Sequence, residues 1–312
     1  MTLVPGGIVD AHHHFWDADR NRHPWLDADP PIPFRYGDYR ALPRRYLPAD
    51  LLADAAPFGL AGSVYVETEW DPTDPLGEMA YVAVLRRASG LPSAAVAQAW
   101  LDREDCEAVL DGLLAFDFVR GIRHKPRANA APGESRPGGM ADPRWRAGFA
   151  ALHRRGLRFD LQTAWWHLHE AADLAHAFPA MPIIVNHAGV PSARDPAAVQ
   201  GWRAAMAMVA ACPNVFCKIS GIGIRGQRWT ADLNREIVLT VIELFGVARC
   251  MFASNYPVDG LCARYDEIYG SFDAITAGCS LAERAALFRD NAVRIYAIPS
   301  DALRPAVRPQ AG

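Results

Sequence analysis

Short apolar runs alternate with longer amphipathic stretches along most of the chain. Each run has the length and apolar content of a buried strand, and the intervening stretches carry Ala, Leu and Arg at helical spacing. The runs occupy residues 7–13, 62–68, 94–101, 118–125, 157–163, 182–188, 214–220 and 250–256. Near-continuous apolar strands that alternate with helices indicate a parallel sheet buried on both faces.

The number of strands favours a closed barrel. Eight strands spread over about 250 residues fit a (β/α)8 TIM barrel of the α/β class better than an open sheet. The alternative, a doubly wound sheet, would ordinarily carry a glycine-rich phosphate-binding turn after its first strand, and GxGxxG is absent there. No linker divides the chain, so we expect residues 1–312 to form one domain with a core over residues 8–297.

Two long loops interrupt the alternation of predicted strands and helices. Residues 17–50 are rich in proline and aromatic residues, and residues 126–144 are rich in glycine and proline. Loops of this length within a compact domain are usually lids or binding loops, or else disordered. They follow the first and the fourth predicted strand, and strand ends form the catalytic face of a barrel. We therefore expect both loops to lie beside a functional site.

Composition narrows the class of function. The 312 residues include 32 basic and 35 acidic ones, and this net charge of −3 gives no field that would attract nucleic acid or a membrane surface. The longest apolar runs are far shorter than a membrane helix, and the first residues lack a secretory signal pattern. The six cysteines show no CxxC spacing, which argues against structural zinc and fits a reducing compartment. We expect a cytoplasmic protein that acts on a small molecule, and a homodimer is compatible with the sequence.

Polar residues follow the apolar part of almost every predicted strand. In the first strand, IVDAHHHFW, alternation puts Asp10, His12 and His14 on one face and His13 on the other. The plainer alternatives are the remnant of an affinity tag and histidines that are merely hydrogen-bonded in the core. The polar residues on the other strands are Glu67, Glu69, Arg123, Lys125, Asp160, Gln162, His187, Lys218, Ser220 and Asn255. Their recurrence favours a polar cavity at one end of a barrel.

Four motifs carry a resemblance that spans residues 8–297. DAHHHFWD in the first strand, VNHAG in the sixth, CMFASNYPVDG in the eighth and the later LFRDNAVRIY resemble the amidohydrolase superfamily. The most similar branch contains lactonases that act on sugar lactones and on lactones of aromatic degradation, such as 2-pyrone-4,6-dicarboxylate. The resemblance implies a barrel in which His12, His14 and His187 hold a metal ion or polarise the substrate.

The eighth strand departs from the pattern of this family. The superfamily usually has an aspartate there that accepts a proton from the attacking water, and this chain has Asn255. An amide is not a base at neutral pH and is a poor metal ligand. The fourth strand has no lysine positioned like the carboxylated lysine of two-metal members, so a two-zinc site is not expected. Glu67 is the favoured group to complete a ligand set or accept the proton, with Glu69 and Asp259 as alternatives.

Hydrolysis of a lactone is compatible with this substitution. Three neutral imidazoles can hold one zinc ion and lower the pKa of its water towards about 7. In the alternative, a metal-free pocket, the same groups donate hydrogen bonds to the lactone carbonyl. We expect one divalent ion, zinc, held by His12, His14, His187 and Glu67.

Clues to the substrate are few. Arg123, Lys125 and Arg225 follow predicted strands and would attract an anionic substrate, and Trp16 offers a flat aromatic surface. The sequence thus predicts a hydrolase that opens a small carboxylated lactone from sugar-acid or aromatic catabolism. Two other functions fit the same barrel. One is a metal-dependent decarboxylase, and the other is a non-catalytic barrel that binds a small acid, for which Asn255 is the best support.

Overall fold

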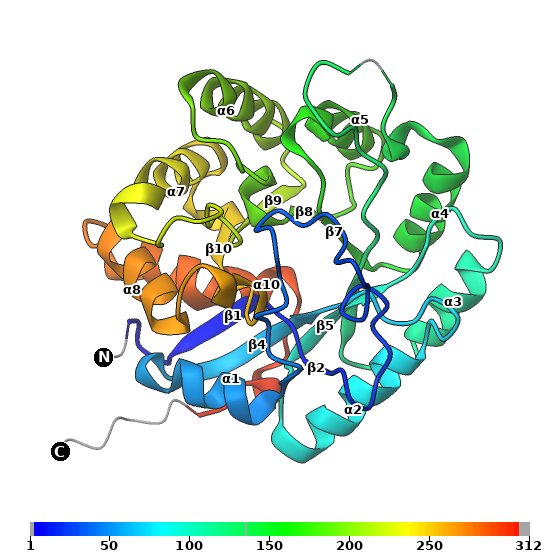
Figure 1. The fold of residues 1–312 in the computed structure, drawn as a ribbon, viewed down its shortest axis with the longest axis horizontal. Coiled ribbons are helices and arrows are strands. Elements are labelled where there is room, and N and C mark those ends of the chain that lie inside the picture. The colour runs from blue at the N-terminus through cyan, green and yellow to red at the C-terminus, as the bar shows by residue number, and fades with distance from the viewer. Residues whose placement is uncertain (1–2, 135, 306–312) are drawn as a thin grey trace.

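The computed structural model describes residues 3–134 and 136–305. Within them eight parallel strands form one sheet in chain order around a barrel, and helices surround it (Figure 1). The strands are β1 (Ile8–His13), β4 (Leu60–Val66), β5 (Ala94–Gln98), β6 (Val119–Arg123), β7 (Arg158–Leu161), β8 (Ile183–Val185), β9 (Val215–Ile219) and β10 (Cys250–Phe252). The predicted (β/α)8 barrel is confirmed, and every predicted run overlaps one of these strands.

The helices follow the strands along the chain, as the amphipathic stretches predict. They are α1 (Pro48–Ala55), α2 (Gly77–Ser89), α3 (Cys106–Leu113), α4 (Pro143–Arg154), α5 (Leu168–Ala177), α6 (Pro196–Ala210), α7 (Ala231–Phe245), α8 (Tyr265–Ile275), α9 (Leu281–Ala285) and α10 (Asn291–Ile295). Short helical turns lie at Ala56–Phe58, Gly139–Ala141, Trp165–His167, His187–Gly189, Val247–Arg249, Val258–Leu261, Ala286–Asp290 and Ser300–Ala302. Asp142 and Asp195 cap the starts of α4 and α6, because their side chains accept backbone N–H groups of the first turn. Among the described residues, no helix has the length and apolarity that crossing a bilayer requires.

The first and last strands of the barrel meet at the end that carries the polar residues. His14 N donates to Tyr256 O at 2.8 Å, and Asn255 N donates to His12 O at 2.8 Å. A parallel bridge also pairs His13 with Tyr256. These contacts make the polar ends of β1 and β10 neighbours, although 241 residues separate His14 from Asn255.

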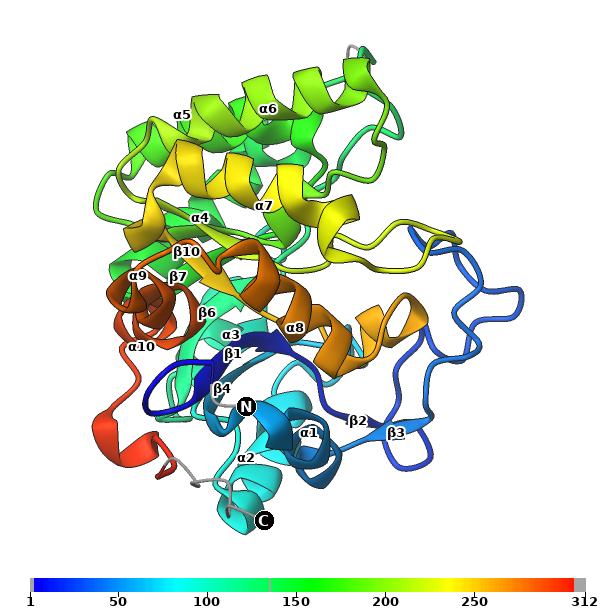
Figure 2. The same cartoon turned by 90° about the vertical axis from the view of Figure 1, so that its left-hand side faces the viewer.

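Apolar side chains fill the barrel below this end. Val9, Ala11 and Val64 belong to an interior cluster that also includes Ala292 and Tyr296 of the C-terminal segment. A larger cluster packs the surrounding helices against the outer face of the sheet. In Figure 2 the helices α9 and α10 lie at the opposite side of the barrel from β2 (Trp16–Asp17) and β3 (Arg45–Tyr46). The carboxyl ends of the strands are therefore the end of the barrel available for a site.

One predicted side-chain direction is wrong. Asp10 does not share a face with His12 and His14, because its carboxylate accepts hydrogen bonds from Ser254 N at 3.0 Å and from Tyr265 OH of α8 at 3.1 Å. The pairing of β1 with β4 shifts register between Asp10 and His13, and this irregularity breaks the simple alternation.

The loop over residues 17–50 is folded onto the open end of the barrel. Its two ends pair as the short antiparallel strands β2 and β3. Trp16 of β2 forms an aromatic cluster with Tyr36 and Tyr39 of the loop, and this cluster packs against Val258, which follows β10. This loop is thus a binding-loop candidate with its own core. In the second loop, 126–144, residue 135 lies outside the described residues.

Candidate active site

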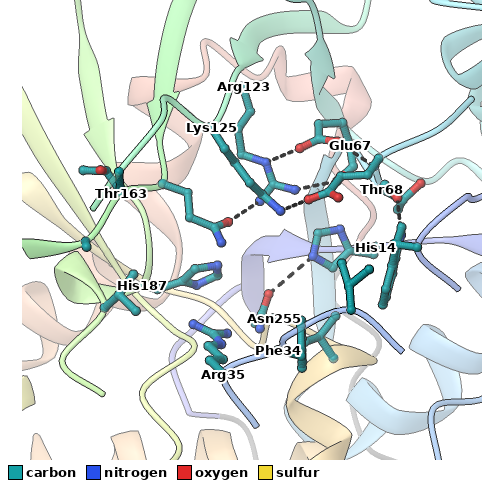
Figure 3. A pocket seen from close by; sticks show the side chains of 18 of the residues that line it. His14, Phe34, Arg35, Glu67, Thr68, Arg123, Lys125, Thr163, His187 and Asn255 are labelled. Carbon is teal, nitrogen blue, oxygen red and sulfur yellow. Dashed lines mark hydrogen bonds and ion pairs between the residues drawn. The ribbon is translucent and has the colours of Figure 1, made fainter. Parts of the chain in front are cut away.

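A cavity of about 380 Å³ opens at the carboxyl ends of the strands (Figure 3). One part of its wall comes from strand ends and the turns that follow them, and the other comes from the loop over residues 17–50. The first group includes His14, Glu67, Thr68, Glu69, Arg123, Lys125, Gln162, Thr163, His187 and Asn255, and the second includes Trp25, Ile32, Pro33, Phe34 and Arg35. A largely polar wall thus faces an aromatic and apolar one.

Three imidazoles converge at the floor of this cavity. The ring centroid of His12 lies 4.6 Å from that of His187 and 5.0 Å from that of His14. His14 and His187 line the cavity, while His12 is fully buried. The ring of His13 points elsewhere and packs against Phe15, with a centroid distance of 4.4 Å. Residues from the first and the sixth predicted strand therefore meet at the mouth of one barrel.

Two of these imidazoles have one nitrogen fixed by the protein. His14 Nδ1 lies 2.8 Å from the carbonyl oxygen of Val66, and His187 Nδ1 lies 3.0 Å from Ser220 Oγ. Because a carbonyl oxygen only accepts, a neutral His14 carries its hydrogen on Nδ1 and its lone pair on Nε2. Both ring nitrogens of His12 are buried without a hydrogen-bond partner in the described part of the chain. Such buried, unpaired polar atoms are rare in stable cores and call for a functional explanation.

Burial keeps the imidazoles neutral. Desolvation lowers the pKa of His14 to about 3 and that of His12 and His187 well below the usual value. Nearby positive charges, such as Lys218 for His12 and Arg123 for His14, lower the pKa further. A neutral imidazole has one donor and one acceptor nitrogen, so at neutral pH each of these rings can donate one hydrogen bond and accept another.

Asn255 connects His14 to a buried carboxylate. The amide Oδ1 lies 3.3 Å from His14 Nε2, and Nδ2 donates to Asp259 Oδ1 at 2.7 Å. Asp259 also accepts from Tyr36 OH at 2.9 Å, and its side chain is fully buried beneath the cavity surface. Burial raises the pKa of the Asp259 carboxyl. Asp259 therefore turns inward after β10, but Asn255 stands between it and the cavity.

Unusual backbone conformations gather around the cavity. Glu69, His187 and Asn255 have φ values of 54°, 55° and 56°. This left-handed region is disfavoured for residues with a Cβ atom, although asparagine tolerates it better than most. Such conformations persist where surrounding contacts hold them, and they cluster at functional sites.

The basic residues predicted to attract an anionic substrate are paired with carboxylates. Arg123 Nη2 donates to Glu67 O at 2.7 Å, and Arg123 Nε contacts Glu67 Oε1. The other carboxylate oxygen of Glu67 accepts from Glu69 N at 2.7 Å. Lys125 forms an ion pair with Glu69. The charges on this part of the wall therefore balance, and Glu67 is held at both oxygens.

The two other predicted substrate residues lie in different places. Trp16 lines the cavity and donates its indole N–H to Pro43 O at 2.8 Å, whereas Arg225 lines a separate, smaller cavity. Trp25, Phe34 and Arg35 line the main cavity without having been predicted individually. No strand period runs through their loop, so the one available signal was its proline and aromatic content.

The expected zinc site requires His12, His14, His187 and Glu67 to act together. The unpaired nitrogens of His12 are the kind of ligand atom that zinc accepts. However, Glu67 is held by Arg123, and the described residues contain no group of three or more His, Cys, Asp and Glu side chains arranged to hold a metal ion. The residues as arranged do not fit a complete zinc site, and no chemical step below is assigned to a metal.

The fold and the site together define the class of protein. A (β/α)8 barrel with a cavity of buried imidazoles at the carboxyl ends of its strands has the architecture of a TIM-barrel enzyme. The family model described as amidohydrolase matches residues 9–298, and the chain belongs to this family. The resemblance predicted from the motifs is thus confirmed, and the protein is a hydrolytic enzyme.

Individual relatives cover almost the whole chain. An uncharacterized protein of Sinorhizobium fredii is 40% identical over 294 residues, which are 93% of this chain and 98% of that protein. An L-fucono-1,5-lactonase of Burkholderia multivorans is 28% identical over 312 residues, covering 94% and 97% of the two chains. A crystal structure of a Burkholderia multivorans amidohydrolase with bound zinc matches with a TM-score of 0.75 and 27% identity, over 94% of this chain and 99% of that one. The similarity therefore extends over a whole barrel rather than a local motif.

Proposed function

We propose that this enzyme is a lactonase, which opens a small lactone by attack of water on the ring carbonyl. The observation that carries the proposal is the pair of buried, neutral imidazoles on the cavity wall. In both His14 and His187 the protein engages Nδ1. Nε2 of His187 forms no hydrogen bond within the described residues, and Nε2 of His14 faces Asn255 Oδ1 at 3.3 Å. The relative named L-fucono-1,5-lactonase supports the same class of reaction.

His14 is assigned the role of proton acceptor. The carbonyl oxygen of Val66 holds the ring hydrogen on Nδ1, so the lone pair lies on Nε2, which faces Asn255 Oδ1 at 3.3 Å in the cavity wall. A general base must lie within hydrogen-bond reach of the attacking water, and it works best when its pKa is near the working pH. With a pKa lowered to about 3, His14 is deprotonated at neutral pH but is a weak base, so its proton uptake depends on stabilisation of the imidazolium.

Asn255 is assigned a supporting role in place of the usual aspartate. Once Nε2 of His14 has taken a proton, it becomes a donor, and Asn255 Oδ1 at 3.3 Å accepts from it. Asp259 fixes this orientation of the amide, because its carboxylate accepts the Asn255 Nδ2 hydrogen at 2.7 Å. Asn255 thus stabilises the imidazolium without being a base.

Glu67 is assigned to orientation rather than to proton transfer. Both of its carboxylate oxygens already accept hydrogen bonds, from Arg123 and from Glu69 N, which makes it a weaker acceptor for water. We assign His187 Nε2 and the Lys125 ammonium, among the donors of residues that line the cavity, to stabilise the negative charge on the lactone oxygen.

The proposed reaction balances with water as its only co-substrate. The water oxygen bonds to the carbonyl carbon as one water proton passes to His14 Nε2. The ring C–O bond then breaks, and the leaving oxygen takes the proton held by His14 Nε2, which returns the imidazole to its neutral form. The product is an open-chain hydroxy acid, which ionises at neutral pH and releases one proton to solution.

The wall of the cavity favours a polyhydroxylated ring. Trp25 and Phe34 present aromatic surface from the loop, while Gln162 and Thr163 present hydrogen-bonding groups from the opposite strand end. Sugar rings combine an apolar face with a rim of hydroxyl groups. A sugar lactone is therefore the substrate class that this wall supports.

The test is a panel of lactones assayed by proton release with a pH indicator. We expect the wild type to release acid from at least one sugar lactone, and His14→Ala to lose that activity while keeping its circular dichroism spectrum. Parallel assays with aromatic acids look for carbon dioxide, which is the product of a decarboxylase. Carbon dioxide release without acid release from any lactone would overturn the proposal.

The same assay tests the metal expectation. Because the described residues form no complete zinc site, we expect a chelator followed by gel filtration to leave lactone turnover within about twofold of its starting value. Loss of turnover after chelation, with recovery on adding zinc, would show that an ion is required and that the imidazoles rearrange to bind it.

A further inference from the structure

A second cavity adjoins the main one. It has a volume of about 70 Å³, against about 380 Å³ for the main cavity, so it suits a small group rather than a ring. Arg35 and Val190 line both cavities, which makes them the boundary between the two. The remaining wall comes from Pro191 and Ser192 after β8 and from the segment 221–225 after β9.

The charge of the second cavity differs from that of the main one. Two guanidinium groups line it, those of Arg35 and Arg225, and no acidic side chain is among its lining residues. Arg225 forms no ion pair with any residue in 3–134 or 136–305, whereas Arg123 and Lys125, which line only the main cavity, are both paired. The second cavity therefore holds a positive charge that no carboxylate within the described residues neutralises.

Arg35 is only partly neutralised. Its Nη2 lies 3.5 Å from Asp259 Oδ1, a long contact for an ion pair, and its Nη1 is buried without a hydrogen-bond partner within the described residues. A buried guanidinium N–H without an acceptor is costly. An anion beside Arg35 would supply that acceptor.

The two guanidinium groups reach this place from different segments. Arg35 belongs to the loop over residues 17–50, and Arg225 follows β9. The side chain of Arg225 lies against Gly37, where an added Cβ would come within 2.6 Å of Arg225 Nε. Gly37 also has a φ of 85°, a conformation that glycine adopts freely. Because Gly37 has no side chain, Arg225 can pack directly against the backbone of the loop at this position.

We propose that the second cavity is a carboxylate subsite, which binds an acidic arm of the substrate while its lactone ring occupies the main cavity. Guanidinium groups bind carboxylates through paired hydrogen bonds, and two of them flank a space that excludes a ring. The inference rests on the proposed lactonase function and narrows its substrate to a lactone that carries a carboxylate a few bonds from the ring.

The experiment compares a neutral aldonolactone with the matching aldaric acid monolactone, which differs from it by one terminal carboxylate. We expect the wild type to have the lower KM for the acidic lactone. We expect Arg225→Gln to raise the KM for the acidic lactone on the order of tenfold more than the KM for the neutral one. Arg228→Gln is the control, because Arg228 lies in the same segment and is exposed like Arg225, but it is paired with Glu267 and does not line the second cavity. We expect that control to leave the ratio of the two KM values unchanged.

A binding measurement separates this inference from the lactonase proposal. Titration calorimetry with malonate, a small dicarboxylate, is run on the wild type, Arg225→Gln and Arg228→Gln. Weaker malonate binding in Arg225→Gln alone supports the subsite even if no lactone is turned over, and in that case only the lactonase proposal fails. Equal malonate binding by all three proteins, or equal effects of Arg225→Gln on the two lactones, overturns the subsite.

Discussion

Two neighbouring layers of polar side chains in the barrel differ in their hydrogen bonding. The upper layer lies two residues further along the strands than the lower one. Below the mouth, Asp160 accepts from Tyr296 OH at 2.9 and 2.8 Å and from Asn186 Nδ2 at 2.9 Å, and it lies 2.6 Å from Lys218 Nζ. This Lys218 cluster, made of Lys218, Asp160, Tyr296 and Asn186, surrounds a fully buried carboxylate with partners.

At the mouth the next residues on the same face of these strands behave differently. Gln162, two residues after Asp160, lines the cavity, and Ser220, two residues after Lys218, contacts His187. His12, fully buried beside His14 and His187, keeps both ring nitrogens without a partner in the described residues. The comparison indicates that the lower layer maintains the fold, while side chains of the mouth such as Gln162 and His187 line the cavity, where a substrate can reach them.

The largest expected effect comes from disabling the mouth. We expect His187→Leu to lower kcat by roughly 10²- to 10⁴-fold, because a group that takes part in proton transfer or charge stabilisation would be lost. His13→Leu is the matched control, since His13 is equally buried but packs against Phe15 away from the cavity. Steady-state kinetics on a sugar lactone measure both variants. Similar losses in the two would show that the mouth has no special chemical role.

The second effect breaks the Lys218 cluster. Lys218→Met would leave Asp160 as a buried carboxylate without its cation, and we expect it to lower the free energy of unfolding by about 3–5 kcal/mol. Lys125→Met removes a cation of the mouth instead, from a pair whose side chains are 39% and 36% exposed, and we expect about 1 kcal/mol or less. Urea unfolding followed by fluorescence measures both. The comparison fails if the exposed pair costs as much as the buried one.

The strands, and the meeting of His12 and His14 with His187, could be predicted because each rests on a repeating pattern. An apolar run marks a strand, and a closed barrel brings strand ends together whatever their separation in sequence. Asp10 was misplaced because a register shift between β1 and β4 leaves no trace in the period of a single strand.

Other features of the site depend on contacts that no period encodes. The ion pair between Arg123 and Glu67 joins the ends of two different strands. Arg123, which was predicted to bind the substrate, instead fixes the position of the Glu67 carboxylate. Arg35 reaches the cavity from an irregular loop, where side-chain direction follows from the packing of Trp16, Tyr36 and Tyr39. Sequence patterns therefore predicted where the site lies, but they did not predict which of its basic residues are neutralised by carboxylates.

The smallest expected effect is the change in the free energy of unfolding with pH that one buried imidazole causes. Its sign follows from the lowered pKa of the buried imidazoles. Burial lowers the pKa of His12, His13, His14 and His187 in the folded protein, whereas in the unfolded chain each titrates near its ordinary value of 6.5. Below pH 6.5 the unfolded chain thus binds more protons than the folded one. Each of these groups then lowers the free energy of unfolding as pH falls, by up to about 1.4 kcal/mol per pH unit. For His14 this loss continues until the pH reaches its folded pKa of about 3.

His13→Leu isolates one of these contributions, because it removes a titrating group without touching the cavity. The buried carboxyls Asp10 and Asp259 have raised pKa values and oppose the trend, but they are present in both proteins and cancel in the difference. We expect the stability of His13→Leu relative to the wild type to change little between pH 7.5 and pH 6.5 and to rise as the pH falls from 6.5 to 5, as measured by urea unfolding at each pH. A difference that stays constant over this range would mean that His13 takes up its proton as readily in the folded protein as in the unfolded chain. Burial would then not lower the pKa of the His13 imidazole in the folded protein.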